Sequence, residues 1–548
     1  MTIKFKIIVL VLLAITFLLP FFSAQNFSPA SDEITHLPSG YSYWKTGFIN
    51  LNPQHPPLVK LIASFPLLFM DLKFDTKDPN LFGSLKDEWK FGANFLFSND
   101  VDRLFFWGRM PVMLLSLLLG LYIFKWASEM FSPKAGILAL FLYAFMPNMI
   151  ANAQFVTTDL AVAVFSFITL HYLWKFFRAG NKPPHQTNDG RFAAILSSDF
   201  HSLWCGGKRY FIYSGLFLGL ALGSKFSAVL LLPIIILLIA AHLWPREESF
   251  DSKLDKFVKL FLALFTLSSI VVYLIYLMPA DLSFYLRGMK SVYADWGKTY
   301  PFYLNGEFSS AGWRHYFLFA FLMKTPIPAL IAFGLAAIMY KKYKLLPNDK
   351  LFILVPMVIF FAVTSMRAGN IGIRYLLPVY PFIILYAGGL ADIFQISWQT
   401  FKKGKIILAP IIALAVWYVF SAFYIYPDYL AYFNEFVGGP KNGYKHLDDS
   451  NIEWGQDIKR LAVYQKQYPD TKVIYSWEYT DLSYYGVNNV LPKEQQSLSN
   501  PFGRYAVNIH FLVRLQELSQ SLNEKNLNWL SLYQPVDRIG YSFFVYEF

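Results

Sequence analysis

Residues 4–36 read KFKIIVLVLLAITFLLPFFSAQNFSPASDEITH, and the class of fold follows from this pattern of an apolar run with charged residues on both sides. Two lysines precede an apolar run from Ile7 to Ala24, which is long enough to cross a bilayer as a helix. The run is long for the apolar part of a secretory signal, and the residues that follow, Gln25-Asn26-Phe27, form a poor cleavage site. We therefore interpret it as a retained first span with a cytoplasmic N-terminus.

The composition of the whole chain agrees with a membrane protein. Of the 548 residues, 55% are hydrophobic and 15% are charged, whereas soluble domains carry about 25% charged residues. This bias excludes an intrinsically disordered chain, and a single Cys excludes a disulfide-rich secreted scaffold. A net charge of +12 would suggest nucleic acid for a soluble domain. In a membrane protein we expect contacts with anionic membrane lipid instead, and no nucleic-acid partner.

Ten further apolar runs follow, so the sequence predicts eleven spans. They cover residues 110–126, 135–149, 156–176, 210–222, 227–244, 258–277, 316–340, 351–365, 375–393 and 406–424. Another run, from Leu58 to Met70, is short for a span and predicts a helix at the membrane interface.

Basic residues set the orientation. With a cytoplasmic N-terminus, the inner connections are residues 125–134, 175–209, 246–259, 341–350 and 402–405, and every one is basic. The short outer connections hold one Lys between them. The positive-inside rule therefore predicts a multi-pass protein of the cell inner (plasma) membrane, and an odd number of spans places the C-terminus outside.

Two parts are expected on this topology. Residues 1–426 form a transmembrane domain, which includes a long first extracytoplasmic loop at residues 25–109. Residues 427–548 are richer in Asp and Glu, with a helix predicted at Trp454–Gln467 and a strand at Lys472–Glu478. The predicted fold is a polytopic α-helical membrane protein with a small extracytoplasmic α/β C-terminal domain.

Ionisable residues near the outer membrane boundary are the candidates for function, because burial of charge near lipid is costly. They occur in six places, all on the predicted outer side: Asp32-Glu33, His55-Pro56-Pro57-Leu58-Val59-Lys60, Thr157-Thr158-Asp159, Gly223-Ser224-Lys225, Lys324-Thr325-Pro326 and Arg374-Tyr375. Each has a plain structural alternative, such as a helix cap at Ser31–Glu33 or an interface lysine in a turn. Adjacent carboxylates point in different directions, so one of Asp32 and Glu33 should face a given cavity. Because all six places lie on the same predicted side of the membrane, together they indicate a functional site.

Cations and carboxylates at one depth suit a reaction on a lipid-linked phosphate. The cations stabilise a phosphate as it takes up charge, and a carboxylate accepts the proton of an incoming hydroxyl. The chain has no Walker P-loop, no His-Glu-x-x-His and no Gly-x-Ser-x-Gly motif.

These motifs resemble those of the GT-C glycosyltransferases, specifically the bacterial protein O-mannosyltransferase-like (family 39-type) enzymes that depend on a polyprenyl-phosphate sugar. The resemblance rests on Asp32-Glu33 and on His55-Pro-Pro-Leu-x-Lys60. It is supported by Asp159, by Lys324-x-Pro326, by Arg374-Tyr-Leu-Leu-Pro378 and by the tail block from Tyr429 to Asp457. It implies a GT-C membrane domain of about 11 transmembrane helices. The implied activity is that of a mannosyltransferase-like hexosyl- or pentosyltransferase, which passes the sugar to an extracytoplasmic acceptor hydroxyl with inversion.

The resemblance also implies roles for individual residues. Asp32 would be the general base, and its catalytic neighbour Glu33 would help bind or position the acceptor or donor. The carrier phosphate would be bound by His55, Lys60, Arg374 and Tyr375, and Asp159 would position acceptor or donor. Lys225 and Lys324 join the phosphate site on depth and charge. Some GT-C enzymes use a divalent metal ion, and the carboxylates here could hold one, although they do not form a clear ligand set. The outer loop from Pro279 to Arg314 is too short for the sugar-binding insert of the eukaryotic enzymes, so the acceptor stays open between protein, lipid and glycan.

Two other classes of protein remain as alternatives. A transporter or flippase of lipid-linked sugars would also carry intramembrane Lys and Arg, and inverted repeats, which we do not find, would favour it. A membrane anchor for the tail domain would not need so many charges at the boundary.

Overall fold

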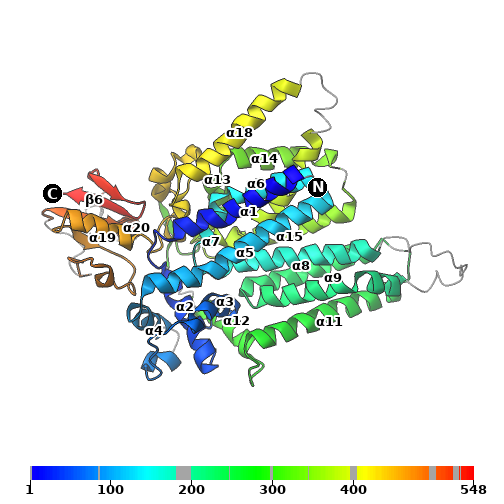
Figure 1. Cartoon of the computed structure of the whole chain (residues 1–548), viewed down its shortest axis with the longest axis horizontal. Coiled ribbons are helices and arrows are strands. Elements are labelled where there is room, and N and C mark those ends of the chain that lie inside the picture. Colours follow the sequence, from blue (N-terminus) through cyan, green and yellow to red (C-terminus); the bar gives the residue numbers. More distant parts are fainter. Residues whose placement is uncertain are drawn as a thin grey trace, which may run out of the picture.

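The computed structural model shows a bundle of long helices with a small α/β unit at one end (Figure 1). The structure describes residues 3–83, 87–180, 199–245, 247–295, 300–343, 345–394, 404–492, 501–521, 530 and 532–548. Within these ranges six helical segments are long and apolar enough to cross a membrane. They are α1 (Ile3–Ala24), α5 (Val101–Met130), α8 (Thr158–Gly180), η3 (Phe226–Leu230) continued by α10 (Leu231–Leu243), α11 (Phe250–Ile275) and α15 (Pro347–Arg367).

Two further helix pairs are bent. The axes of α6 (Pro133–Ala144) and α7 (Pro147–Ala153) differ by 65°, and those of α13 (Tyr316–Lys324) and α14 (Ile327–Ile338) differ by 117°. A proline lies at each break: Pro147 is the first residue of α7, and Pro326 lies between α13 and α14. Proline has no backbone N–H and disfavours helix at the residue before it. If each pair is one span, the count reaches eight.

The eleven predicted runs are all helical, but not all are spans by length. The remaining three lie in α9 (Asp199–Leu222), α16 (Tyr380–Gly388) and α18 (Gly404–Tyr424). The described, apolar parts of the last two are shorter than a span. The basic stretches at 181–198 and 402–403 lie outside the described residues. The structure therefore supports six to eight spans in its described part, where the sequence predicted eleven.

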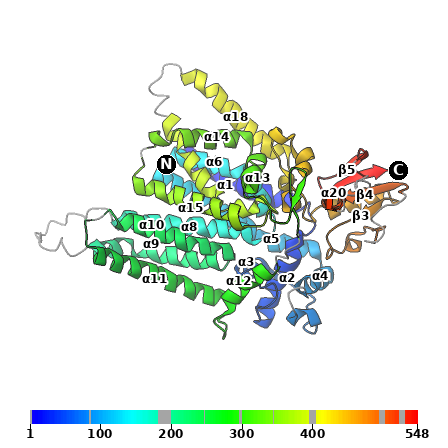
Figure 2. The same cartoon turned by 180° about the vertical axis from the view of Figure 1, so that it is seen from behind.

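The first outer loop forms a compact helical layer at the end of the bundle that carries the tail (Figure 2). It contains α2 (Ser31–Thr46), α3 (Leu58–Ser64), η1 (Phe65–Phe69), η2 (Pro79–Phe82) and α4 (Asp87–Phe97). Helix α3 begins directly after Pro56-Pro57, at the predicted start. It crosses α2 at Gly40, where a Cβ would lie 2.0 Å from the carbonyl oxygen of Lys60, so the close crossing requires glycine.

The second long outer loop adds an amphipathic helix and a hairpin that the sequence analysis did not predict. Helix α12 (Phe284–Asp295) precedes β1 (Phe302–Leu304), which pairs antiparallel with β2 (Glu307–Ser309). Gly288 of α12 lies against Phe226 and the carbonyl of Pro53, so this helix packs beside the first outer loop.

The tail contains a four-stranded sheet in the order β3-β4-β6-β5. Its elements are α19 (Ile458–Gln467), β3 (Lys472–Ile474), β4 (Arg504–Asn508), α20 (Ile509–Ser521), β5 (Asp537–Ile539) and β6 (Phe543–Glu547). Strand β3 is parallel to β4, and the other pairs are antiparallel. Alternate residues of the strands enter two small cores, one on each face of the sheet.

The predicted helix and strand of the tail are both longer than the observed ones. The helix begins at Ile458 rather than Trp454, because the residues before it bond to the first outer loop: Ser28 N–H donates to Gln456 O (2.9 Å) and Ser31 N–H to Trp454 O (2.7 Å). The strand ends at Ile474. Hydrophobic residues between Tyr429 and Trp454 belong to the core of the transmembrane domain, and the tail's own cores begin at Ile458.

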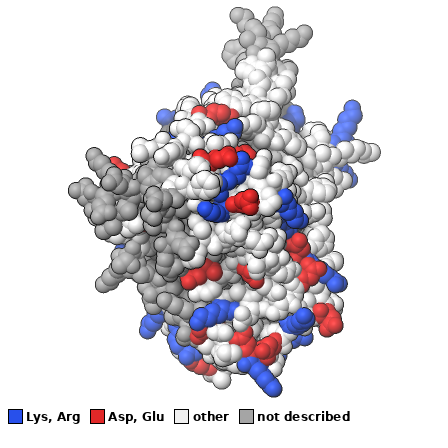
Figure 3. Space-filling view, turned by 90° about the vertical axis from the view of Figure 1, so that its left-hand side faces the viewer, with Lys and Arg blue, Asp and Glu red and all other residues white. Residues whose placement is uncertain are grey.

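Seen from the tail end, Lys, Arg, Asp and Glu are interspersed among uncharged residues over the surface (Figure 3). No large patch of one sign appears on the part of this face that the structure describes.

Candidate active site

Four charged side chains from four separate segments meet at the end of the bundle that carries the tail. They are Asp32 in the first turn of α2, Asp159 in the first turn of α8, Lys225 just before η3, and Arg374 in η5 (Ile373–Leu376). We call these four residues the charge cluster.

Ion pairs connect the cluster in a chain. An Arg374 guanidinium nitrogen lies 2.6 Å from the Asp32 carboxylate and 3.8 Å from that of Asp159. The Lys225 ammonium pairs with the other oxygen of Asp159 at 2.5 Å. The side chain of Asp32 is 24% exposed, whereas those of Asp159, Arg374 and Lys225 are 3, 9 and 11% exposed. Asp32 is therefore the member of the cluster that a substrate can reach most easily.

Two aromatic rings hold the cations in place. The Lys225 ammonium lies 4.4 Å from the centre of the Tyr375 ring, and the Arg374 guanidinium lies 5.5 Å from that ring and 4.2 Å from the ring of Trp454. Such cation–π contacts are stronger where the cation is desolvated, as both are here. Tyr375 was predicted as a site residue; Trp454 was not, although it lies in the tail block on which the resemblance rests.

Glu33 points away from the charge cluster. Its side chain is fully buried, and its two oxygens accept bonds from Arg109 at 2.9 and 2.5 Å. They also accept from the backbone N–H groups of Val156 (2.7 Å) and Ala30 (2.9 Å). Ala30, rather than the expected Ser31, is thus the residue before the first turn of α2. With both oxygens occupied, Glu33 joins α2, α5 and the start of α8 to one another.

Lys60 organises the loop before α3. Its buried ammonium donates to the backbone carbonyls of Asn52 (2.7 Å) and His55 (2.8 Å), to the Asn52 side-chain oxygen (3.0 Å) and to the Tyr43 hydroxyl (3.1 Å). Asn52 has a φ of +54°, a left-handed conformation that Asn tolerates well. Burial lowers the pKa of Lys60 to about 7. Its hydrogen bonds are directed to the loop rather than to the charge cluster.

His55 and His36 form a pair beside the cluster. Their rings lie 5.0 Å apart, edge to face, and His36 Nδ1 donates to the Val156 carbonyl at 2.8 Å. Burial lowers the pKa of both imidazoles, and neighbouring cations contribute to this lowering. Both rings are therefore neutral at neutral pH. The sequence analysis gave His36 no role, but its spacing of four from Asp32 places the two on one face of α2.

Lys324, the last residue of α13, holds the tail block of Tyr429 to Asp457 against that helix. Its ammonium donates to the carbonyls of Leu430 (2.8 Å) and Asn451 (2.5 Å) and lies 4.3 Å from the centre of the Phe433 ring. The side chain is 1% exposed. Among the described residues these partners belong to the tail block, so the structure does not bring Lys324 together with Lys225 and Arg374.

We predict that Lys324→Met lowers stability rather than catalysis. The change leaves two buried carbonyls without their charged donor, which costs about 2–3 kcal/mol. The measurement is thermal unfolding of the detergent-purified protein, with Lys259→Met as the matched control because Lys259 is 60% exposed on α11. A variant that unfolds like the wild type but has lost its affinity for a phosphate ligand would instead place Lys324 in the binding site.

The described residues contain no group of three or more His, Cys, Asp or Glu side chains placed to hold a metal ion. The two carboxylates of the charge cluster, Asp32 and Asp159, are each paired with a cation of that cluster.

Comparison with known proteins supports the resemblance. Residues 101–183, which include α5 and α8 with Asp159, match the family described as dolichyl-phosphate-mannose-protein mannosyltransferase. No curated protein sequence matches the chain.

Solved structures match over almost the whole chain. The apo structure of ArnT from Cupriavidus metallidurans matches with 14% identity and a TM-score of 0.50, covering 98% of this chain and 97% of that one. The structure of the same protein bound to undecaprenyl phosphate matches with 13% identity and a TM-score of 0.48 over the same shares. The Archaeoglobus fulgidus oligosaccharyltransferase AglB, in complex with an inhibitory peptide and a dolichol-phosphate, matches with 11% identity, a TM-score of 0.46 and coverage of 93% and 70%.

The chain is thus a multi-pass membrane protein with the fold of the GT-C glycosyltransferases, as the sequence resemblance predicted. Within that class, the segment from α5 to the end of α8 is similar to the mannosyltransferase family named above.

Proposed function

We propose that the protein is a glycosyltransferase that moves a sugar from a polyprenyl-phosphate carrier to an acceptor hydroxyl on the extracytoplasmic face, with inversion at the anomeric carbon. The observation that carries this proposal is the charge cluster, in which the accessible carboxylate of Asp32 lies 2.6 Å from a cation that can bind phosphate. The sugar is a hexose or a pentose, and the inner (plasma) membrane with a cytoplasmic N-terminus is the proposed setting.

The pairing within the cluster suggests how the donor activates the site. Without substrate, Arg374 is divided between Asp32 and Asp159, and Lys225 is paired with Asp159. A donor phosphate that binds Arg374 and Lys225 competes with Asp32 for the guanidinium. Asp32 is then released from its ion pair as the donor arrives, and Asp159 keeps the two cations in place.

The transfer step follows from these positions. The acceptor oxygen attacks the anomeric carbon on the face opposite the phosphate, and its proton passes to the Asp32 carboxylate. A new C–O bond forms as the bond from the anomeric carbon to the phosphate oxygen breaks. The leaving polyprenyl phosphate keeps the electron pair, and Arg374 and Lys225 stabilise its added negative charge. Attack from the opposite face inverts the configuration.

An apolar groove beside the cluster suits the lipid tail of such a donor. It has a volume of about 570 Å³ and is lined by apolar and aromatic residues of α2, α3, η1, α5 and α11, among them Trp44, Leu61, Ile62 and Leu274. Leu58, which also lines it, donates its N–H to the carbonyl of Gly223, two residues before Lys225 (3.1 Å). A prenyl chain in this groove would bring its phosphate end toward Lys225. Undecaprenyl phosphate is bound by ArnT, whose apo structure shares the fold of this chain.

Filling the groove should weaken binding of long-chain donors specifically. We expect Ile62→Trp to raise the donor KM about tenfold, because the ring occupies space that otherwise buries isoprene carbons worth about 0.8 kcal/mol per CH₂. The measurement compares a long polyprenyl-phosphate sugar with a donor of one or two isoprene units, whose KM should change little. Leu262→Trp is the control, since Leu262 is 54% exposed on α11 and does not line the groove. Equal effects on both donors would place the prenyl chain elsewhere.

The function is tested with purified protein in vesicles that contain a polyprenyl-phosphate sugar labelled in the sugar. We expect release of polyprenyl phosphate together with a new glycosidic product when an acceptor extract is added. Movement of the carrier lipid between leaflets without any such product would support a transporter and contradict the proposal. Mass spectrometry of surface glycans, lipids and glycoproteins from a deletion strain identifies the acceptor class.

A further inference from the structure

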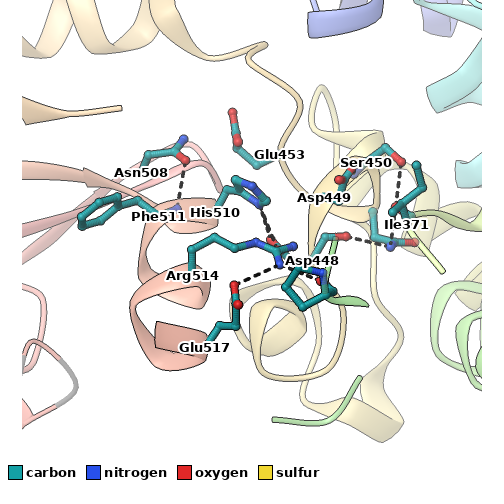
Figure 4. Close-up of polar contacts among 12 residues, drawn as sticks. Ile371, Asp448, Asp449, Ser450, Glu453, Asn508, His510, Phe511, Arg514 and Glu517 are labelled. Carbon is teal, nitrogen blue, oxygen red and sulfur yellow. Dashed lines mark hydrogen bonds and ion pairs between the residues drawn. The ribbon is translucent and has the colours of Figure 1, made fainter. Parts of the chain in front are cut away.

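A buried network of charges lies in the tail, outside the charge cluster. The Asp448 carboxylate accepts a bond from His510 Nδ1, which lies 3.0 Å from one oxygen and 2.9 Å from the other. Arg514, one helical turn further along α20, donates to Asp448 at 2.9 Å (Figure 4). Asp448 and His510 are 4 and 9% exposed, so this network is an ion pair buried inside the protein rather than a surface contact.

The network extends to the second outer loop of the transmembrane domain. Arg514 also donates to the hydroxyl of Tyr300 (2.9 Å) and to the carbonyl of Pro301 (2.7 Å). The Tyr300 hydroxyl in turn donates to Asp449 at 2.8 Å. Asp448 and Asp449 are thereby tied at once to helix α20 and to the loop that precedes β1.

The residues next to Asp449 hold the backbone that leads to Arg374. They form a short 3-10 turn, η9 (Asp449–Asn451). Ser450 Oγ donates to the carbonyl of Ile371 (2.9 Å), as Figure 4 shows, and the N–H of Ile373 donates to the side-chain oxygen of Asn451 (3.0 Å). The turn therefore clamps the chain on both sides of Gly372.

The clamp is close enough to set the position of the arginine that follows. A Cβ on Gly372 would lie 2.3 Å from Ser450 Oγ, so a side chain at this position would displace the hydroxyl that donates to Ile371. The same tail segment continues to Trp454, whose ring lies 4.2 Å from the Arg374 guanidinium. Both the backbone and the side chain of Arg374 thus rest on residues 449–454.

We propose that Asp448, His510 and Arg514 are positioning residues, through which the tail domain holds Arg374 in place to bind the donor phosphate. This inference rests on the function proposed above. In the described structure none of the three contacts a member of the charge cluster, and they act through Asp449, the η9 turn and Trp454.

The ion pair between His510 and Asp448 forms only over a limited range of pH. His510 faces Asp448, Asp449, Glu453 and Arg514 and stacks on Trp477 at 5.1 Å (Figure 4 shows all but Trp477). Burial by itself would lower the pKa of His510, but the Asp448 carboxylate outweighs it and the pKa is raised. Its raised pKa means that the ion pair is fully formed below the ordinary His value and is lost as the pH rises through the raised value. On the acid side, His510 and Arg514 outweigh burial and hold the pKa of Asp448 below its ordinary value, so the pair persists in mild acid.

The test is donor kinetics of full-length variants in vesicles. Asp448→Asn should raise the donor KM about tenfold, and the milder Tyr300→Phe, which keeps the ring and removes one hydroxyl, about threefold. Asp448→Glu should recover part of the loss. Arg504→Gln is the matched control, because it removes a partly exposed ion pair to Glu547 in the same domain. For the wild type, the donor KM should rise as the pH rises through the raised pKa of His510, and His510→Gln should have a raised KM that no longer varies over this range.

A purely structural role would lower the amount of folded protein without changing KM or its pH profile. Folded Tyr300→Phe and Asp448→Asn proteins with the wild-type donor KM overturn this inference alone. A wild-type protein that does not turn over the donor overturns the proposed function as well, which distinguishes the two failures.

Discussion

Asp32→Asn should reduce kcat by about 10³-fold, because removal of a general base typically costs 10²–10⁴. The amide has the size of the carboxylate but accepts no proton from the acceptor. Arg374 keeps Asp159 as a partner, so the variant should fold and insert normally. Turnover of a labelled donor, compared with thermal unfolding of the same preparation, measures both effects.

The donor KM of this variant gives a sharper test. If the phosphate competes with Asp32 for Arg374, the neutral amide of the variant removes the competitor, and the KM should stay level or fall. Asp102→Asn is the matched control: it is a second outer-boundary carboxylate, 60% exposed and paired with Lys459 at 2.7 Å, and its loss should leave kcat unchanged. Undiminished turnover by the Asp32 variant would refute its role as the base.

Glu33→Gln should lower stability and leave turnover nearly unchanged, which is the opposite of the outcome expected for Asp32→Asn. It leaves the Arg109 guanidinium buried without its counter-charge, which costs about 3–5 kcal/mol of stability. Arg109 is itself 3% exposed, so water cannot replace the lost carboxylate. We expect a large fall in the temperature of unfolding, with near wild-type turnover for each molecule that remains folded.

The partner residue supplies the control for this prediction. The double variant Glu33→Gln with Arg109→Met should regain part of the lost stability, because it removes both charges, and the coupling between the two sites is measured by a double-mutant cycle. A Glu33→Gln protein that is as stable as the wild type but inactive would show that Glu33 takes part in the reaction.

Sequence alone selected residues that lie together in the structure, but it did not predict the direction of every side chain. Asp32, Asp159, Lys225, Arg374 and Tyr375, chosen from separate segments, do meet in the structure. The depth of a charge in the membrane can be read from hydropathy, which explains this outcome. Whether a buried lysine faces a cavity or its own backbone cannot be read in this way. Lys60 and Lys324 satisfy carbonyls, and nothing in their local sequence separates them from Lys225.

Contacts between residues far apart in the sequence could not be predicted either. Trp454 stacks on Arg374 from 80 positions further along the chain, and His510 reaches Asp448 from the helix that follows β4. Such pairings depend on how the tail docks, which periodicity does not encode. The same holds for the bends at Pro147 and Pro326, where the composition predicts an apolar run but not the angle between its halves.

The pairing of residues 28–31 with residues 454–456 has a consequence for how the protein is made. The chain is synthesised in the N-to-C direction, so Asp32 is made long before Trp454. Until then Arg374 lacks both the turn that clamps its backbone and the ring that supports its side chain. A partly synthesised chain therefore contains Asp32 before Arg374 is held in position. On the proposed function, activity therefore requires that the segment around Asn451 and Trp454 has been made and has packed against Arg374.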